Sequence, residues 1–213
     1  MKIDNIVVLG LGYIGLPTAA TFASMKKHVI GVDIQEAIVD SINQGKVHIS
    51  ETNLESLVEE AVENGYLSAS LEPQEADVFI ITVPTPFTEV YRDDKIFFEP
   101  DLSYIKASVI GIAPVIKKGD LIVLESTSPV GTTEKISTWL SKERPDLLFP
   151  SYSSDDTDIN IAYCPERVLP GNVMRVTLSC DHRSVDGAVG SAFLNTFKNY
   201  MENPVLLLGK GAI

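Results

Sequence analysis

A short glycine-rich segment near the N-terminus constrains this chain more than any other feature. Residues 10–15 read G-L-G-Y-I-G. They follow an apolar, β-branched run at 3–9 and precede an alanine-rich run at 17–25 that has helical spacing. A glycine turn between a strand and a helix is the context in which the G-x-G-x-x-G pattern indicates a dinucleotide site.

The three glycines of this pattern have separate expected tasks. Gly10 allows the tight turn, Gly12 lets the backbone approach a pyrophosphate, and Gly15 permits close packing of the helix on the strand. The N-terminus of the helix then faces the phosphates. The alternative is a glycine turn that binds nothing.

The second strand, predicted over 29–32, is followed by an acidic residue that indicates which dinucleotide can bind. The carboxylate of Asp33 can accept hydrogen bonds from both ribose hydroxyls of an adenosine, and it would repel a 2′-phosphate. Ile34 and Gln35 supply no positive charge that could neutralise such a phosphate. We therefore expect NAD as the cofactor. Asp33 could also cap a helix that begins at Glu36.

Beyond Asp33 the chain alternates between helical spacing and uniformly apolar runs. Helical spacing predicts helices over 36–44, 54–64 and 102–116, and another through Trp139. Uniformly apolar runs predict buried strands over 78–83 and 121–124. Residues 88–99 have no clear period and 150–158 are rich in Ser and Asp, so both are predicted as loops. Alternation of this kind predicts an α/β fold, a Rossmann-like doubly wound parallel sheet with helices on both faces.

Charge and cysteine content exclude several classes of partner and site. The formal net charge is −12, which argues against a nucleic-acid partner and against anionic membrane surfaces. Cys164 and Cys180 are too few for a disulfide framework and fit no zinc spacing, so we expect two buried thiols and no metal site. The N-terminal apolar run is too short to span a membrane. The expected location is the cytoplasm.

Two further motifs fall at the predicted carboxyl ends of strands, where open α/β sheets bind ligands. P-T-P occupies 84–86, and S-T-S-P-V-G-T-T occupies 126–133. Their hydroxyl groups could line the nicotinamide half of a dinucleotide site. Ser and Thr are also ordinary turn and cap residues, so each motif alone could be only a turn.

Taken together, these motifs resemble the UDP-glucose/GDP-mannose dehydrogenase family, also called nucleotide-sugar 6-dehydrogenases. The resemblance covers residues ~1–174 and includes G-L-G-Y-I-G-L-P-T-A, V-D-I, V-P-T-P, E-S-T-S-P-V-G-T-T and A-Y-C-P-E-R-V-L-P-G, in the family's order. It implies oxidation of the C6 alcohol of a sugar to a carboxylate with two NAD. P-E-R-V-L-P-G is similar to the branch that acts on UDP-N-acetyl-D-mannosamine.

The resemblance also implies roles for individual residues. It implies catalytic roles for Thr127 and Glu166, and contacts with the nucleotide sugar for Arg167 and Val168. Glu166 would act as a general base toward the water that hydrolyses a thioester. In the alternative reading Glu166 only pairs with Arg167 or another neighbour. The cofactor positions are Gly10, Gly12, Tyr13, Ile14, Gly15, Asp33, Pro84, Thr85, Thr127 and Thr133.

One part of the family's machinery does not occur in these 213 residues. The resemblance implies a cysteine nucleophile in a G-x-G-G-x-C segment of the following domains, together with a lysine and an asparagine. The surroundings of Cys164 and Cys180 do not match that segment. We therefore expect the chain to bind NAD without forming the thiohemiacetal that the reaction requires.

Residues ~175–209 have a different resemblance. They contain D-H-R-S-V-D-G, which is similar to the D-H-R-x-x-D-G motif at the C-terminal end of dihydrolipoyl acyltransferases. This resemblance implies that His182 is a base for the thiol of coenzyme A and that Asp186 holds the local geometry. The alternative is a histidine in a solvated turn, since the rest of that catalytic domain is absent from this sequence.

The two resemblances give two predicted domains, 1–174 for NAD and 175–213 as an acyltransferase-like tail with short α/β structure. The change near Met174 is abrupt and suggests a fused or misassembled reading frame. The leading hypothesis is the NAD-binding portion of a nucleotide-sugar dehydrogenase whose partner molecule is a nucleotide sugar. An acyltransferase fragment and a non-catalytic NAD-binding module are the alternatives, and a homo-oligomer is possible for each.

Overall fold

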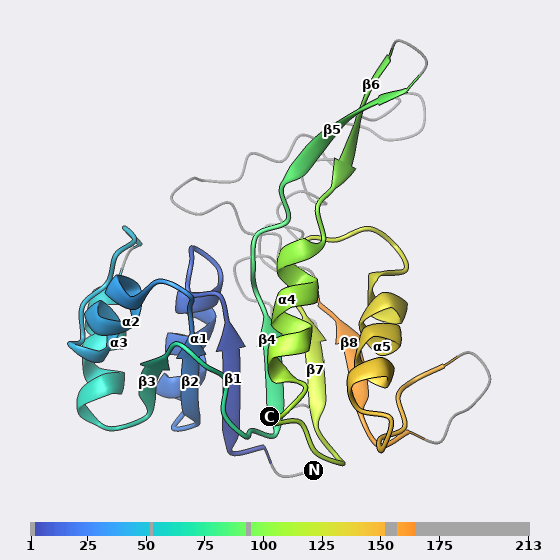
Figure 1. The fold of residues 1–213 in the computed structure, drawn as a ribbon. Helices are drawn as coiled ribbons and strands as arrows, with labels where there is room; N and C mark the ends of the chain where they lie inside the picture. Colours follow the sequence, from blue (N-terminus) through green and yellow to red (C-terminus); the bar gives the residue numbers. More distant parts are fainter. Residues whose placement is uncertain (1–2, 52, 93–94, 152–156, 165–213) are drawn as a thin grey trace, which may run out of the picture. The chain divides into compact units, whose positions relative to one another are not determined.

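The chain is described by a computed structural model that covers residues 3–51, 53–92, 95–151 and 157–164. Helices and strands alternate along most of it (Figure 1). The elements are β1 (Asn5–Leu9), α1 (Gly15–Ser24), β2 (His28–Val32), α2 (Glu36–Asn43), α3 (Leu54–Glu63), β3 (Leu67–Ser70), β4 (Val78–Ile81), β5 (Phe87–Arg92), β6 (Lys95–Pro100), α4 (Ser103–Ile112), β7 (Leu121–Leu124), α5 (Thr132–Glu143) and β8 (Asn160–Tyr163).

Six of the strands form one parallel sheet in the order β3-β2-β1-β4-β7-β8. The chain starts in the middle of this sheet, builds outward through β2 and β3, and then returns to add β4, β7 and β8 on the other side of β1. This is the strand order of the dinucleotide-binding Rossmann fold, in which ligands bind where the order reverses. The predicted fold class is confirmed. The reversal lies between β1 and β4.

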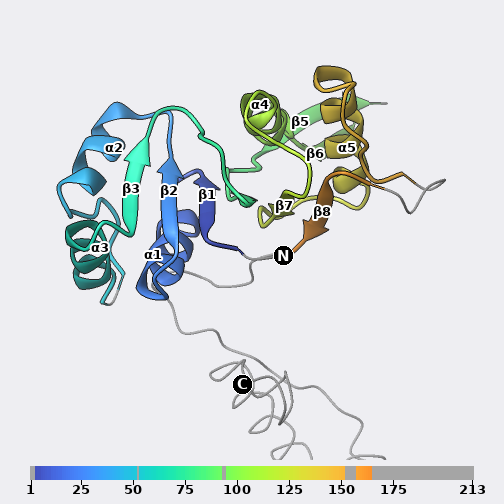
Figure 2. The same ribbon diagram turned by 90° about the horizontal axis from the view of Figure 1, so that it is seen from below.

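Two hydrophobic layers hold the helices on the sheet. Alternate residues of β1 point to opposite faces, so Val7 belongs to one core cluster and Val8 to the other. Helices α4 and α5 pack into the cluster of Val7, and α1 and α3 pack into the cluster of Val8 (Figure 2). Because both faces are covered, the central strands are uniformly apolar, as the sequence indicated.

The segment predicted as a loop at 88–99 is instead an antiparallel hairpin of β5 and β6. Its register pairs Glu89 with Phe98 and Val90 with Phe97, so aromatic residues lie on both faces. This pairing removes the simple apolar and polar alternation that identifies a strand in a sequence. The prediction of a loop was wrong for that reason.

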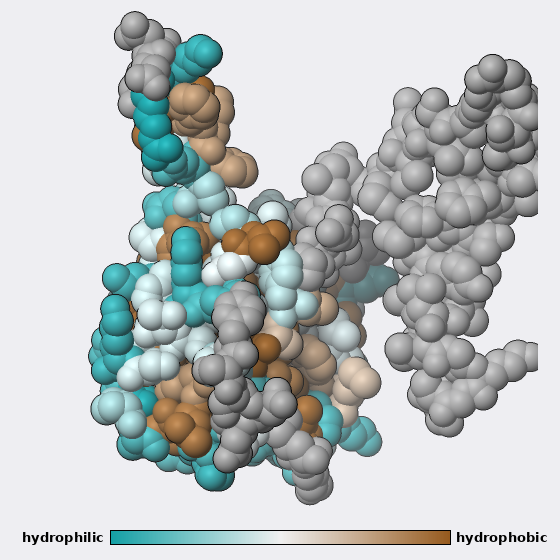
Figure 3. Space-filling model, turned by 90° about the vertical axis from the view of Figure 1, so that its right-hand side faces the viewer, coloured by the Kyte–Doolittle hydropathy of each residue, from teal (hydrophilic) through white to brown (hydrophobic). Residues whose placement is uncertain are grey.

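The hairpin extends beyond the carboxyl edge of the sheet (Figure 1). Several of its apolar side chains are exposed. Phe87 and Phe98 are 69% and 65% exposed. In Figure 3 the hairpin, at the top, carries brown and tan surface beside teal. An ion pair between Arg92 and Glu99, 2.6 Å apart, joins its two strands.

The two edge strands of the sheet, β3 and β8, were not predicted. Edge strands need less apolar sequence than central ones: β3 reads L-S-A-S, and most of β8 is exposed. Cys164, which directly follows β8, is exposed, so the expectation that it is a buried thiol was wrong. Cys180 lies outside the described residues.

Candidate dinucleotide site

The glycine turn between β1 and α1 has the backbone geometry that its sequence indicated. Gly10 has a φ of +92°, a conformation that other residues rarely adopt. A Cβ atom at Gly15 would overlap the carbonyl oxygen of Gly10 and Oγ1 of Thr82. A Cβ atom at Gly12 would meet nothing within 4 Å. Gly15 therefore packs against the chain, whereas Gly12 faces open space.

Thr82, directly after β4, ties the glycine turn to the neighbouring strand. Its Oγ1 lies 2.8 Å from the carbonyl oxygen of Leu9 and 2.7 Å from that of Gly10. Helix α1 then begins without a side-chain cap at Ile14 and without an acidic residue in its first turn. The positive end of its dipole thus remains suited to an anion such as a pyrophosphate.

Asp33 is held in place at the carboxyl end of β2 by two backbone N–H groups. Its Oδ2 accepts a hydrogen bond of 3.0 Å from the N–H of Leu11, and its Oδ1 accepts one of 3.0 Å from the N–H of Gln35. A carboxylate oxygen can accept more than one hydrogen bond, so Asp33 keeps acceptor capacity for ribose hydroxyls. The alternative role of Asp33 as a helix cap was wrong, since Gln35 is the N-cap of α2.

The loops after β4 and β7 are fixed to each other by side-chain hydroxyl groups. Thr85 donates a hydrogen bond of 2.7 Å to the carbonyl oxygen of Thr127, and Ser126 donates one of 2.7 Å to that of Val83. On the far side, the hydroxyl oxygen of Tyr163 lies 3.3 Å from both the nitrogen and the carbonyl oxygen of Ser128. The S-T-S segment is therefore positioned from both neighbouring strands.

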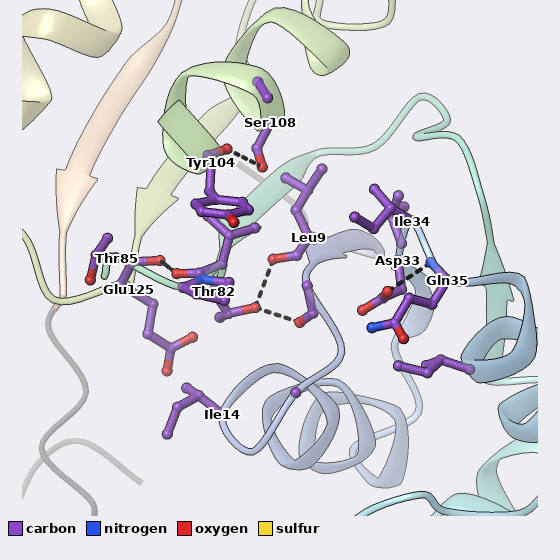
Figure 4. Close-up of a pocket in the computed structure, with 18 of the residues that line it drawn as sticks. Leu9, Ile14, Asp33, Ile34, Gln35, Thr82, Thr85, Tyr104, Ser108 and Glu125 are labelled. Carbon is purple, nitrogen blue, oxygen red and sulfur yellow. Dashed lines mark hydrogen bonds between the residues drawn. The ribbon is translucent and has the colours of Figure 1, made fainter. Parts of the chain in front are cut away.

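A cavity of about 1270 Å³ opens at the carboxyl edge of the sheet, between the end of β2 and the loops after β4 and β7. It is larger than the roughly 300–1,000 Å³ of most small-molecule sites, which suits a dinucleotide. Figure 4 shows Asp33 and Gln35 on one side of the glycine turn, and Thr85 and Glu125 on the other. The predicted residues that line the cavity are Gly10, Gly12, Tyr13, Ile14, Asp33, Pro84, Thr85 and Thr127.

Two other predicted cofactor residues have a different placement. Gly15 serves the packing of α1 rather than the cavity wall. Thr133 lies in the first turn of α5, where its hydroxyl donates a hydrogen bond of 2.9 Å to Glu134. The structure brings neither of them to the cavity lining. The remaining predicted site residues, Glu166, Arg167, Val168, His182 and Asp186, lie outside the described residues.

Several lining residues were missed by the sequence analysis. Glu125 directly precedes the S-T-S motif, and its place at the end of a predicted strand was a usable signal. Tyr104 comes from α4, which no motif marks. His48, Ile49 and Leu71 come from irregular segments on the Asp33 side, for which sequence spacing gives no signal.

The residues present fit a bound NAD. Gly12 leaves room for a ligand next to the uncapped end of α1, and Asp33 presents a carboxylate at the rim. Beside Asp33, the apolar side chains of Ile34 and Leu71 line the cavity and are 87% and 48% exposed, as expected for surfaces that a flat aromatic base would cover. Among the described residues, no lysine or arginine lines the cavity on this side.

Neither a metal site nor a membrane span is found in the described ranges. No three His, Cys, Asp or Glu side chains of residues 3–51, 53–92, 95–151 and 157–164 group as they would around a metal ion. No helix of the same ranges is long and apolar enough to cross a membrane.

Comparisons with known proteins indicate a family for this chain. The profile described as "UDP-glucose/GDP-mannose dehydrogenase family, NAD binding domain" matches residues 4–198. The match continues past position 174, where the sequence analysis placed the start of an acyltransferase-like tail. That second resemblance stays a prediction.

Curated relatives and a solved structure agree with the profile. An NDP-N-acetyl-D-galactosaminuronic acid dehydrogenase of Ralstonia nicotianae is 57% identical over 83% of this chain and 40% of its own length. A UDP-N-acetyl-D-mannosamine dehydrogenase of Escherichia coli K12 is 55% identical over 88% of this chain and 43% of its own. The solved UDP-D-ManNAc dehydrogenase of Pyrococcus horikoshii is 38% identical, with a TM-score of 0.67 over 78% of this chain and 37% of its own. The chain thus spans about two fifths of the length of the relatives it matches.

Proposed function

The chain belongs to the UDP-glucose/GDP-mannose dehydrogenase family, and from that premise we propose that it holds NAD for the oxidation of a nucleotide sugar at C6. Its fold and its family are those of the NAD-binding domain of such enzymes. The bound NAD would supply a hydride acceptor. The observation that carries the proposal is the pairing of open space at Gly12 with the anchored carboxylate of Asp33 across one cavity.

We infer roles for the chain's own residues from this geometry. Gly12 and the first turn of α1 would hold the pyrophosphate, and Asp33 would accept hydrogen bonds from the adenosine ribose. Thr85 and Thr127, which are linked to each other, would border the nicotinamide half. The N–H groups that fix Asp33 keep its carboxylate in place before the cofactor arrives, which lowers the entropic cost of binding.

We propose an N-acetylated nucleotide sugar, in particular UDP-N-acetyl-D-mannosamine, as the substrate of the whole enzyme. The names of the Ralstonia nicotianae and Escherichia coli relatives support an N-acetylated sugar. The P-E-R-V-L-P-G motif supports the mannosamine branch. In this proposal Arg167 and Val168 contact the sugar nucleotide, and Glu166 acts as a base.

Complete turnover is proposed for a protein that also carries the family's cysteine nucleophile. The measurable activity of this chain by itself is therefore NAD binding. A cytoplasmic location and assembly into a homo-oligomer belong to the same proposal, and the oligomeric state can be read from light scattering of the purified chain.

Calorimetric titration with NAD and NADP tests the proposal. We expect NAD to bind at one site and NADP to bind at least about tenfold more weakly, because Asp33 repels the 2′-phosphate. Asp33→Asn should weaken NAD binding roughly 10- to 100-fold, the range for hydrogen bonds to a charged group. Asp40→Asn, an exposed carboxylate on α2, is the matched control and should change nothing. A folded sample that binds neither dinucleotide would contradict the proposal.

A further inference from the structure

Glu125 is a second carboxylate at the carboxyl edge of the sheet, on the opposite side of the glycine turn from Asp33. It directly follows β7, whereas Asp33 directly follows β2, and β1 and β4 lie between these two strands. Its backbone N–H donates a hydrogen bond of 2.9 Å to the carbonyl oxygen of Ile81, which fixes Glu125 just beyond the β4–β7 pair. The two acids therefore line one cavity from opposite sides of the glycine turn.

The Glu125 carboxylate is held against α1 inside this cavity. Its Oε1 accepts a hydrogen bond of 3.4 Å from the hydroxyl of Thr18, and its Oε2 is buried. Figure 4 shows the carboxylate directed toward Ile14, on the side of the glycine turn away from Asp33. The Glu125 carboxylate thus lines the site in partly buried surroundings, where solvent screens a charge less than on an open surface.

The positions of Asp33 and Gly12 set the direction of a bound dinucleotide. With its adenosine ribose at Asp33 and its pyrophosphate at Gly12, the molecule extends toward β4 and β7, so its nicotinamide half lies on the side of Glu125. The nicotinamide ring carries a positive charge in NAD and none in NADH. A nearby carboxylate therefore attracts the oxidised form more strongly than the reduced form.

We propose that Glu125 makes the site discriminate between the two oxidation states, in favour of NAD. This inference rests on the proposed function, since it takes the cofactor to lie as that function requires. Its consequence is that the bound cofactor has a lower reduction potential, and that reduced cofactor binds more weakly than oxidised cofactor. Such a site suits an enzyme that must exchange its cofactor between two oxidation steps.

A purely structural role for Glu125 makes a different prediction. If the bond between Thr18 and Glu125 only fastened α1 to β7, its loss would weaken NAD, NADH and ADP-ribose to the same extent. ADP-ribose lacks the nicotinamide, so it reports the adenosine and pyrophosphate parts of the site alone. Comparing the three ligands separates charge recognition from loss of local structure.

The test is titration of Glu125→Gln with NAD, NADH and ADP-ribose. The preference for NAD over NADH should fall about tenfold relative to the unmodified chain, which corresponds to about 30 mV for a two-electron couple. Affinity for ADP-ribose should change by less than about twofold, because this ligand has no nicotinamide charge for Glu125 to attract. Thr18→Val, which removes the hydrogen bond but keeps the charge, should retain the preference. Asp33→Asn should weaken all three ligands together.

The possible outcomes distinguish failure of the role of Glu125 from failure of the proposed function. Equal weakening of NAD and NADH in Glu125→Gln, or an unchanged ratio, would overturn the role of Glu125 while leaving NAD binding intact. Failure of the unmodified, folded chain to bind NAD or ADP-ribose would instead overturn the proposed function. If Glu125→Gln does not fold, Glu125→Ala is measured in the same way. ADP-ribose binding establishes that the variant is intact.

Discussion

The two edges of the parallel sheet use their polar groups in different ways. At the carboxyl edge, Asp33 and Glu125 border a cavity of about 1270 Å³. At the amino edge, Asp77 accepts hydrogen bonds of 2.9 Å from the N–H groups of Asp4 and Asn5. Asp33 and Glu125 thus border a space for a ligand, whereas Asp77 joins β4 to β1.

A second group of polar side chains at the amino edge also bonds within the protein. Nζ of Lys117 donates a hydrogen bond of 2.6 Å to the carbonyl oxygen of Ala76 and lies 3.1 Å from Oδ1 of Asp120. Asp120 is 2% exposed, and its burial raises the pKa of its carboxyl group despite the hydrogen bonds from Lys117. Lys117 and Asp120 thus bond to other groups of the protein near the start of β4 and β7. The polar groups of the amino edge thus stabilise the sheet, whereas those of the carboxyl edge border the space for a ligand.

Gly15 and Gly12 separate packing of the glycine turn from space for a ligand. In Gly15→Ala the new methyl group overlaps the Gly10 carbonyl and Thr82, so we expect a loss of roughly 3 kcal/mol in the free energy of unfolding. In Gly12→Ala the methyl group meets no chain atom, so stability should change by less than about 1 kcal/mol, although NAD binding is lost. Urea unfolding and calorimetry measure the two quantities. Equal destabilisation by both substitutions would break the distinction between packing and ligand space.

The next effect concerns Asp77 and depends on pH. The hydrogen bonds from Asn5 and Asp4 hold the pKa of Asp77 below its usual 3.8. Its stabilising contribution is therefore present above that pH and is lost as the pH falls through the lower, folded-state value. We expect Asp77→Asn to cost roughly 1 kcal/mol near pH 7 and progressively less below pH 3.8.

Urea unfolding of the unmodified chain and of Asp77→Asn, at pH 7 and at acid pH, checks this pH dependence. NAD affinity is the control. Asp77 lies at the amino edge, so the affinity at pH 7 should not change. A variant that keeps its stability but loses NAD binding would contradict the assignment of the two edges.

The hydroxyl group of Tyr163 makes only a weak contact with the loop after β7. Its hydroxyl lies 3.3 Å from the backbone of Ser128, which is a long hydrogen-bond distance, and the side chain is 45% exposed. Tyr163→Phe should lower the free energy of unfolding by about 0.5 kcal/mol and weaken NAD binding about twofold. A calorimetric titration at matched temperature detects this change. A loss of tenfold or more would show that the S-T-S loop depends on Tyr163 alone.

The central sheet and the glycine turn could be predicted because local sequence determines them. Uniformly apolar strands such as β4 and β7 are buried on both faces, and the glycine spacing at 10–15 matches a single backbone geometry. Asp33 was found for the same reason, since it directly follows such a strand. These features depend on neighbours in the sequence.

The features that were missed depend on contacts between distant segments. The aromatic residues of β5 and β6 acquire two faces only when the strands pair, and β3 and β8 are strands because β2 and β7 offer a free edge. Glu125 and Tyr104 reach the cavity only when β7 and α4 pack beside the glycine turn. Periodicity within one segment carries no signal for such partners.

Hydrogen exchange of the backbone amides, with and without saturating NAD, measures which edge of the sheet binds the dinucleotide. We predict that NAD slows exchange at the cavity-lining amides of Gly10, 12–14, Thr85 and 125–127, and leaves the amino-edge amides of Asp4, Asn5 and Lys117 unchanged. Slowed exchange at the amino edge alone, or no change anywhere in a folded sample, would contradict the claim that the carboxyl edge receives the dinucleotide.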